Sequence, residues 1–531
     1  MSNTDAFKSQ IEAGYTFEGE SITLGAAMLE GAPVTGCHVK IPLKTLNRHG
    51  LIAGATGTGK TKSLQVITEQ LANNGVSSLI MDIKGDLSGI AAPSSSPDKM
   101  QERENKIGQI DGKDFMASGS SVEFLTLSGE PGARLRATVS EFGPILLSKI
   151  LELNSTQSGL MSVIFQYCDN KELPLLDLKD LKKTLQFISN EGKEEIEADY
   201  GKVSSASTGT ILRKIVELEQ QGADVFFGEK SFEVNDLVRL DENGRGMVNI
   251  LRLTDIQSKP KLFSTFMLQM LAEVYAEFPE QGDADRPKLC LFIDEAHLLF
   301  AEASDALLDQ VESVVKLIRS KGVGIFFITQ NPNDIPDAIL GQLGLKVQHA
   351  LRAFTAKDRK AIKSAAQNFP ESEHYDVAEL LTQMGIGESL VTVLGENGIP
   401  TPLAHTYMRA PLSRMDVLTK AEIDEILSNS KMVAKYNEEV DRESAYEILN
   451  AKINGFKEAA ASAESSKEAE KEAAALEKAR IAAEKSEAKE AEKAAKARGK
   501  IVGTVGKEVA NVAVRGLLGA FGIKTRKRKF F

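Results

Sequence analysis

The sequence is poor in the residues that support disulfide frameworks and histidine-based metal sites. Its three cysteines, Cys37, Cys168 and Cys290, lie far apart and form no CxxC pair. Their spacing excludes a disulfide scaffold and a zinc ribbon, and it predicts a chain that resides in a reducing cytosol. The six histidines do not cluster either. No metal site built on histidine is therefore expected.

Long apolar segments are also absent. The first residues, MSNTDAFKSQIEAG, lack the basic stretch and apolar core of a secretory signal. No run of about 18 apolar residues is present, and the best candidate is interrupted by Lys507, Glu508 and Arg515. Lys and Arg total 64 against 75 Asp and Glu, a net charge of −11. This balance excludes a uniformly basic nucleic-acid coat protein but allows a locally basic channel. A large, soluble, cytoplasmic protein is predicted.

The 531 residues divide into five segments of different composition. Residues 1–46 carry short β-like runs and predict a small N-terminal β cap. Residues 47–415 begin with HGLIAGATGTGKTKSLQVITEQLANNGVSSLIMDIKGD, a strand–turn–helix–strand pattern that predicts a parallel α/β sheet. Within this segment, residues 91–246 predict a helical insert, whereas 288–294 and 324–330 predict further buried strands.

The C-terminal part of the chain changes composition twice. After a predicted helical connector at 416–456, residues 457–500 are almost wholly Ala, Glu, Lys, Ser and Arg. Pairs such as Glu464/Lys467 favour an exposed helix on the order of 60 Å long, and the lack of an apolar seam excludes a coiled coil. The alternative is a partly disordered linker. Residues 501–531 are predicted to be an amphipathic segment with a basic end, which suits an anionic membrane, nucleic acid or a partner. The alternative is that this segment docks on its own chain or is disordered.

The strongest chemical signal is a complete GxxxxGK[ST] phosphate-binding loop between a predicted strand and a predicted helix. Its glycines let backbone N–H groups turn toward phosphate oxygens, and the next helix presents its positive end to them. Lys60 is expected to reach the β- and γ-phosphates of ATP, and the Thr61 hydroxyl is expected to bind Mg²⁺. The predicted nucleotide-binding residues are Gly54, Ala55, Thr56, Gly57, Thr58, Gly59, Lys60 and Thr61.

The second signal is LCLFIDEAH, an apolar strand that ends in two carboxylates and is typical of a Walker B motif. Asp294 is expected to hold the Mg²⁺ shell, and Glu295 to orient and deprotonate the attacking water. The structural alternative is that both carboxylates cap the next helix. His297 is predicted to be a packing residue.

Two further strand ends carry polar side chains. Gln330 closes the strand GIFFITQ, where it is expected to contact the γ-phosphate or the water, unless it only caps the strand. Asp82 follows the apolar run LIM and is expected at the same sheet edge, unless it is an ordinary turn aspartate. Both residues are therefore predicted as members of the catalytic site.

Together these motifs resemble the HerA/FtsK-type ATPases. The resemblance is carried by GATGTGKT, MDIKGDLSG, FIDEAHLLF and IRSKGVGIFFITQNPNDIPDAILGQLGLKVQHALRAF. More narrowly, the chain looks like the bacterial HerA-like family of YjgR-like proteins, long catalogued as a domain of unknown function. The resemblance implies a RecA-like P-loop NTPase of the additional-strand (ASCE) class. The DEAH string also suggests a superfamily 2 helicase, but the Ser-Ala-Thr and Gly-Arg-x-Gly-Arg motifs of that class are absent.

The resemblance also implies an assembly. HerA-like ATPases form hexameric rings with the nucleotide between subunits and an arginine finger supplied in trans. Arg319 matches the finger position of the family, and Arg352 is the second candidate. HerA members pump DNA with a nuclease partner, and FtsK members translocate duplex DNA. This sequence has no obvious winged-helix domain, and only a short stretch where a HerA-type barrel would lie.

The predicted function is Mg²⁺-dependent ATP hydrolysis by a ring ATPase that drives DNA translocation or helicase-like work. The alternative is an ATP-dependent assembly or membrane-associated factor, recruited through peripheral membrane contact of residues 501–531 and without a DNA substrate. A third hypothesis, a nucleotide-dependent scaffold with negligible turnover, is disfavoured by Glu295 and Arg319.

Overall fold

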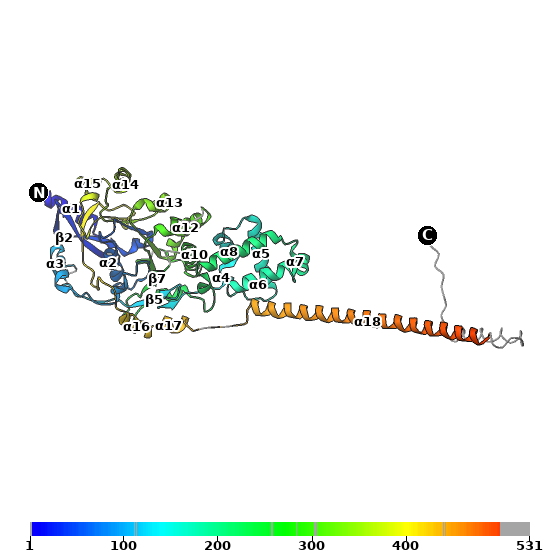
Figure 1. The fold of residues 1–531 in the computed structure, drawn as a ribbon. Coiled ribbons are helices and arrows are strands. Elements are labelled where there is room, and N and C mark those ends of the chain that lie inside the picture. The colour runs from blue at the N-terminus through cyan, green and yellow to red at the C-terminus, as the bar shows by residue number, and fades with distance from the viewer. Residues whose placement is uncertain are drawn as a thin grey trace. The chain divides into compact units, whose positions relative to one another are not determined.

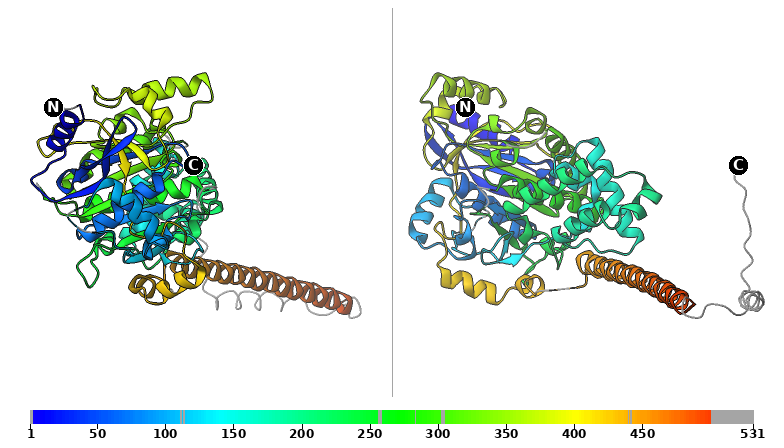
Figure 2. Two further views of the ribbon diagram at one scale, coloured as in Figure 1. Left: turned by 90° about the vertical axis from the view of Figure 1, so that its left-hand side faces the viewer. Right: turned by 45° about the vertical axis from the view of Figure 1, so that its right-hand side comes forward.

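The structure is a computed structural model that describes residues 3–110, 112, 114–255, 259–282, 284–301, 305–438, 440 and 442–499. The chain forms two compact units, Met1–Ala451 and Lys452–Phe531. The first unit contains a sheet with helices packed around it (Figures 1 and 2).

A single twelve-stranded sheet organises the first unit, in the order β2-β1-β12-β11-β10-β3-β9-β8-β4-β7-β5-β6. From β10 to β6 all neighbouring strands are parallel. These strands are β10 (Leu345–Gln348), β3 (Gly50–Ala53), β9 (Val323–Thr329), β8 (Leu289–Ile293), β4 (Ser77–Asp82), β7 (Val248–Arg252), β5 (Val122–Thr126) and β6 (Ala133–Arg134). Strand β8 lies within the predicted range 288–294, β9 begins one residue before the predicted range 324–330, and both strands are buried throughout. The α/β prediction is confirmed.

The other end of the sheet is antiparallel. It consists of β2 (Ala32–Pro42), β1 (Ser21–Leu29), β12 (Ala404–Met408) and β11 (Glu388–Val393), and β11 pairs with β10. The N-terminal strands thus extend the main sheet through β12. Residues 3–14, which the sequence suggested were β-like, instead form helix α1 (Asn3–Gly14), because Phe7 and Ile11 lie one turn apart and are buried together in the core that includes β1 and β2.

Helix α2 (Lys60–Asn73) covers one face of the parallel strands. Its side chains Leu64, Ile67 and Leu71 share a core with Ile80 of β4 and Phe292 of β8. Alternate residues of a strand point to opposite faces, so the continuous apolar runs of β4, β8 and β9 supply cores on both sides. Helix α10 (Pro260–Glu277) packs with α12 (Asp305–Ile318) and α4 (Val139–Ile150).

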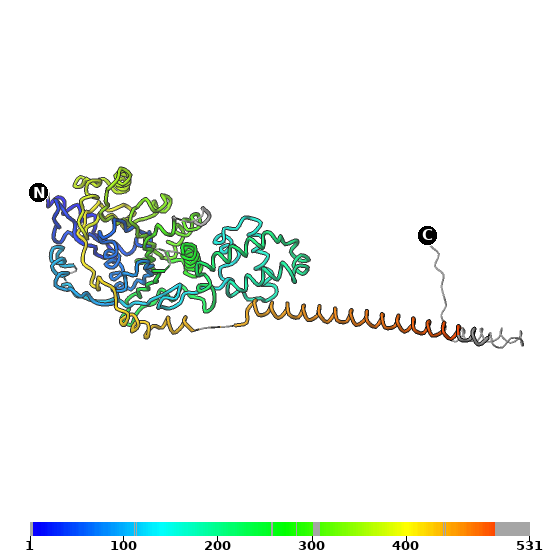
Figure 3. The backbone as a smooth tube through the Cα atoms, in the orientation of Figure 1, coloured from blue at the N-terminus to red at the C-terminus, as the bar shows by residue number. Residues whose placement is uncertain are grey.

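The segment predicted as a helical insert is mainly helical. Its helices are α3 (Pro97–Ile107), α4, α5 (Ser155–Asn170), α6 (Leu178–Ser189), α7 (Lys193–Tyr200), α8 (Ser205–Gln220) and α9 (Ala223–Phe226). The trace in Figure 3 shows α4 to α8 as one neighbouring group. Strands β5 and β6 interrupt this segment and join the main sheet, which the sequence analysis did not predict.

The remaining helices follow β8 in the chain. They are α11 (His297–Ala301), α12, α13 (Asp337–Leu340), α14 (Ala356–Ala366), α15 (Val377–Gln383), α16 (Lys420–Ser428), α17 (Lys431–Tyr436) and α18 (Ala445–Gly499). Residues 454–493 of α18 are all exposed, in agreement with an exposed charged helix. The amphipathic segment 501–531 lies outside the described residues. Among the described helices, none is long and apolar enough to cross a membrane.

Candidate functional site

Four neighbouring parallel strands bring the predicted motifs to one edge of the sheet. Strand β9 lies between β3, which leads into the glycine loop, and β8, which leads into Asp294 and Glu295. Strand β4, on the other side of β8, ends at Asp82. The register pairs Ala53 with Thr329, Ile293 with Phe327 and Met81 with Ile293, so the carboxyl ends of all four strands lie within two residues of one another. Ligands of parallel α/β sheets bind at this edge.

The glycine loop has backbone conformations that require glycine. Gly54, Gly57 and Gly59 have φ angles of 151°, 78° and 118°. A Cβ on Gly54 would lie 2.5 Å from the Cβ of His349, so this glycine also allows a close approach to the residue after β10. The His349 ring in turn contacts Ser63 of α2 through Nε2, at 2.9 Å from Oγ. The loop and the first turn of α2 are thereby held to β10. Thr61 is the second residue of α2 and is half-buried.

Lys60 folds back over this loop. Its Nζ donates hydrogen bonds to the carbonyl oxygens of Gly54, at 2.6 Å, and Ala55, at 3.2 Å. Burial and the nearby ammonium of Lys84 lower the pKa of Lys60. The ammonium group of Lys60 therefore lies against the glycine loop, which is the loop that binds phosphates in P-loop proteins.

The two acidic residues that follow β8 are buried. Burial raises the pKa of Asp294 to about 6, although Lys84 acts in the opposite direction. Glu295 has a φ of 46°, which is uncommon for a residue with a side chain. Its Oε2 has no hydrogen-bond partner in the described part of the chain, although Nδ1 of His297 lies 3.2 Å away. The predicted packing residue His297 thus lies against the carboxylate of Glu295.

The sequence analysis missed the role of Lys84. Its Nζ forms an ion pair with Oε1 of Glu295 and lies 3.9 Å from Oδ2 of Asp294. Burial opposes the charged form of Lys84, but the two carboxylates together hold its pKa above the ordinary value. Burial likewise opposes the charged form of Glu295, yet its pKa is lowered by Lys84. The signal available in the sequence was the lysine two residues after Asp82, at the same strand end.

Asp82 is occupied by its own loop. Its carboxylate accepts hydrogen bonds from the backbone N–H groups of Gly85, at 2.7 Å, Asp86, at 3.3 Å, and Leu87, at 3.2 Å. Burial nevertheless raises its pKa to about 6. These hydrogen bonds fix the loop that carries Lys84 and Asp86. They agree with the alternative that Asp82 is an ordinary turn aspartate, and its place at the end of β4 agrees with a position at the same sheet edge.

The remaining predicted residues lie at both edges of the sheet. Gln330 follows β9 at the edge of the glycine loop and is exposed. Arg352 is also exposed and follows β10, beyond Ala350, whose carbonyl oxygen accepts a hydrogen bond from Ala55 at 2.8 Å. Arg319 is exposed in the short turn Arg319–Lys321 before β9, at the opposite edge. Seven residues of β9 separate the two edges, roughly 23 Å.

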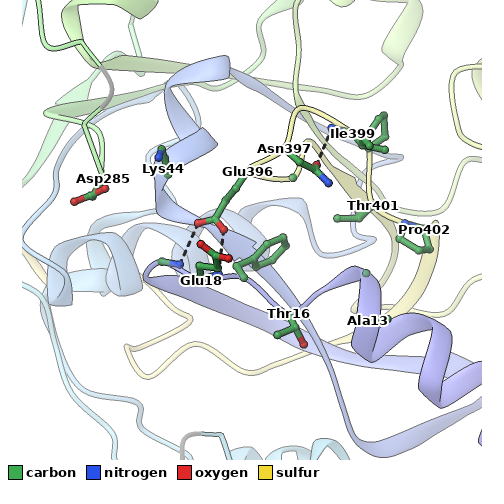
Figure 4. Close-up of a pocket in the computed structure, with 15 residues that line it drawn as sticks. Ala13, Thr16, Glu18, Lys44, Asp285, Glu396, Asn397, Ile399, Thr401 and Pro402 are labelled. Carbon is green, nitrogen blue, oxygen red and sulfur yellow. Dashed lines mark hydrogen bonds between the residues drawn. The ribbon is translucent and has the colours of Figure 1, made fainter.

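Two cavities differ in their relation to this edge. The first, of about 320 Å³, is bordered by Gly59 and Lys62 and contains the Arg103 guanidinium 3.9 Å from the centre of the Tyr407 ring. The second, of about 830 Å³, lies at the antiparallel end of the sheet, where Glu396 accepts hydrogen bonds from the backbone of residues 18 and 19 (Figure 4). None of the predicted site residues borders the second cavity.

The oxygen donors at this edge fit a magnesium ion. The Thr61 hydroxyl and the Asp294 carboxylate are hard oxygen ligands, and Mg²⁺ in P-loop proteins uses few protein ligands besides phosphates and water. The described residues contain no cluster of three or more His, Cys, Asp or Glu that would hold a metal without such help. The sheet has the P-loop NTPase fold, in which the additional strand β9 lies between the P-loop strand β3 and the Walker B strand β8.

The chain belongs to the helicase HerA-like C-terminal family, whose model matches residues 28–528. It is 20% identical over 362 residues to the DNA double-strand break repair helicase HerA of Sulfolobus acidocaldarius, covering 66% of this chain and 64% of that protein. For the protein of the same name from Saccharolobus solfataricus, the identity is 21% over 359 residues, covering 66% and 63%. The chain thus spans less than two thirds of the length of these relatives.

A solved structure supports the fold. The bacterial conjugative coupling protein TrwBdeltaN70 superposes with a TM-score of 0.50 at 14% identity, covering 77% of this chain and 94% of that chain. At this identity the likeness concerns the fold alone. The RecA-like P-loop prediction and the HerA-like assignment are confirmed, and the narrower YjgR-like assignment stays a prediction.

Proposed function

We propose that the chain hydrolyses ATP at the common edge of β3, β9, β8 and β4. The observation that carries this proposal is that the glycine loop and the buried pair Asp294 and Glu295 lie at the same carboxyl edge of neighbouring strands. Backbone N–H groups of residues 54–61 hold the phosphates, and Lys60 turns from its loop carbonyls to the β- and γ-phosphates. Glu295 positions the attacking water and accepts its proton, while Gln330 contacts the γ-phosphate or that water.

The proposed magnesium ligands are the Thr61 hydroxyl and, through the coordination shell, Asp294. When bound, Mg²⁺ neutralises charge on the phosphate oxygens. Asp82 supports the site by fixing the loop that carries Lys84. We place the nucleoside in the cavity of about 320 Å³ beside Gly59, because it continues directly from the phosphate loop. There, the stacked Arg103 and Tyr407 offer a planar surface to a base.

We further propose that the working form is a homo-oligomeric ring, a hexamer by family resemblance, with DNA as the polymer that it moves. The relatives from Sulfolobus acidocaldarius and Saccharolobus solfataricus are DNA double-strand break repair helicases, which supports DNA as substrate. A nuclease partner remains a proposal from the same resemblance. The predicted domain boundaries and the cytoplasmic location are also proposals.

The decisive experiment is steady-state hydrolysis of ATP by wild type, Lys60→Ala and Glu295→Gln. We expect Lys60→Ala to lose binding and turnover, and Glu295→Gln to retain bound ATP while the turnover number falls by roughly 10²–10⁴-fold, as expected when a general base is removed. Lys346→Ala, which removes a half-buried lysine of β10, is the matched control and should hydrolyse ATP normally. Wild-type turnover by Glu295→Gln would refute the assigned base.

A second measurement addresses the polymer. The rate of ATP hydrolysis is compared with and without double-stranded DNA, and the mass of the protein in solution is determined under the same conditions. Stimulation by DNA together with a ring-sized mass supports translocation. An unstimulated rate would leave ATP hydrolysis intact and remove double-stranded DNA from the proposal.

A further inference from the structure

A strongly basic surface lies on α14 and on the loop that connects it to β10. Between Arg352 and Lys363 the chain has five cationic residues and one acidic residue, a net charge of +4, whereas the whole chain carries −11. All five cations are exposed: Arg352, Lys357, Arg359, Lys360 and Lys363. None of the five forms an ion pair within the described part of the chain. The basic charge is therefore available to a ligand.

The fold of α14 explains why these cations share one side. Ile362 and Ala365 are buried in a small core with Leu381 of α15, and α14 and α15 lie side by side in Figure 1. With about 100° per residue, the four cations of α14 occupy the arc opposite these two apolar residues. The helix is thus anchored by its apolar face, and its basic face has no structural task in the described chain.

The one acidic residue of the segment is already engaged. Asp358 accepts hydrogen bonds from the backbone N–H groups of Phe354, at 2.9 Å, and Thr355, at 2.7 Å, while its own N–H is bound by the Thr355 hydroxyl. This capping box fixes the start of α14. Asp358 therefore stabilises the helix end and leaves the basic face of the helix to a ligand.

An exposed aromatic residue, Phe354, lies between Arg352 and Lys357 in the sequence. Phe354 is 86% exposed, more than any other large apolar residue in the described chain. Its backbone N–H donates a hydrogen bond to Asp358, so the backbone that carries the ring is held at the start of α14. Exposed aromatic rings beside cationic side chains are the combination with which proteins bind single-stranded nucleic acid, because bases stack on the ring while phosphates pair with the cations.

We propose that this surface, formed by Phe354, Lys357, Arg359, Lys360 and Lys363, binds a single DNA strand. The lysine and arginine side chains contact successive phosphates, and the Phe354 ring stacks on an unpaired base. The inference rests on the proposed function for DNA as the ligand, and it locates the contact. The surface follows β10, whose end is hydrogen-bonded to the phosphate loop through Ala55 and Ala350, so it is joined to the nucleotide site by one short segment.

The test measures binding of a fluorescein-labelled oligothymidine to the full chain between about 50 and 200 mM salt. The variant Lys357→Ala/Lys360→Ala/Lys363→Ala removes three cations and keeps good helix formers. We expect it to bind less tightly and to flatten the plot of log affinity against log salt by roughly two, since each neutralised phosphate contributes about 0.7. Phe354→Ala should weaken binding by roughly tenfold and leave the salt slope unchanged.

The controls separate this surface from the proposed enzyme. Lys193→Ala/Lys202→Ala/Lys420→Ala removes three exposed lysines elsewhere and should bind as wild type does. ATP hydrolysis without DNA should be unchanged in the α14 variant.

Three outcomes would contradict the proposal. Equal affinity and equal salt slope for wild type and the α14 variant would show that this surface does not bind DNA, although the protein does. If wild type binds no DNA, the proposed role of this surface is refuted, whereas the proposed ATP hydrolysis is not affected. Loss of binding to phosphatidylserine vesicles with intact DNA binding would assign the surface to a membrane and also overturn the proposal.

Discussion

At the scale of single residues, Lys84 compensates the charge of the proposed catalytic pair. The side chains of Asp294 and Glu295 are only 6% and 7% exposed, and that of Lys84 is 32% exposed. Two neighbouring carboxylates in such a place are costly unless a cation compensates them. Lys84 supplies this cation. It must then leave Glu295, or share it with water, before that carboxylate accepts a proton.

Lys84→Ala should therefore destabilise the nucleotide-free protein. We expect a loss on the order of 2 kcal/mol in the free energy of unfolding, less than for a fully buried pair because Lys84 is partly exposed. The measurement is urea unfolding of wild type, Lys84→Ala, Glu295→Gln and the double variant. In this double-mutant cycle, the loss caused by Lys84→Ala should shrink when Glu295 is already neutral. Additive losses would show that the two side chains do not interact.

The sequence located the strand-end residues but not this contact. Asp82, Gln330, Asp294 and Glu295 were placed at one edge because each follows an apolar run and parallel strands end together. The ion pair of Lys84 depends on how the loop after β4 folds over Asp82. No periodic pattern encodes that path.

At the scale of elements, α2 is held by the segment that follows β12. Glu69 of α2 accepts hydrogen bonds from the backbone N–H of Leu412, at 2.7 Å, and from the N–H and hydroxyl of Ser413, at 3.2 and 3.0 Å. Gln65, one turn earlier, donates to the carbonyl oxygen of Arg414 at 3.0 Å. The helix that carries the phosphate-loop lysine is thereby fixed by side chains along its length.

Glu69 should also make stability depend on pH. Burial raises its pKa from 4.5 to about 7, despite the hydrogen bonds that it accepts. The unfolded chain releases this proton near pH 4.5 and the folded chain near 7, so the contribution of Glu69 to stability is full below 4.5 and is lost as the pH rises to 7. Between these values wild type should lose on the order of 3 kcal/mol relative to Glu69→Gln.

Urea unfolding of both proteins at pH 5 and pH 8 measures this difference. The exposed Glu12 of α1 provides the matched control, and Glu12→Gln should follow the wild-type pH dependence. A constant difference between wild type and Glu69→Gln across this range would contradict the raised pKa.

The elements themselves were predicted unequally. Long apolar runs identified β8 and β9, and the glycine loop identified α2. Helix α1 was missed because its apolar contribution is limited to a few residues, such as Phe7 and Ile11, within an otherwise polar stretch. Strand β6 has two residues and is defined only by its neighbour β5. The pairing of β1 with β12 joins residues 379 to 383 positions apart, such as Ala27 with Thr406 and Gly25 with Met408, and local patterns carry no information on such pairing.

At the scale of the whole molecule, the position of Arg319 bears on how subunits of the proposed ring would cooperate. Arg319 precedes β9, whereas the phosphate loop, Asp294 and Glu295 lie at the other edge of the same sheet. The length of β9, roughly 23 Å, keeps this arginine away from the nucleotide of its own subunit. If Arg319 is the arginine finger, it must therefore act on the site of a neighbouring subunit. Arg352 lies at the near edge and has no such restriction.

Mixing inactive subunits tests this arrangement. Lys60→Ala and Arg319→Ala should each be inactive alone, whereas in randomly mixed rings about one interface in four joins an intact phosphate loop to an intact finger. ATP hydrolysis should then recover to at most about a quarter of the wild-type rate. A mixture of Lys60→Ala and Glu295→Gln should not recover activity, because both residues serve the same edge of one subunit.

Mass measurements must show mixed rings in both samples. Mixed rings of Lys60→Ala and Arg319→Ala without activity would exclude Arg319 as a finger supplied in trans, and the same mixture with Arg352→Ala would then test the second candidate.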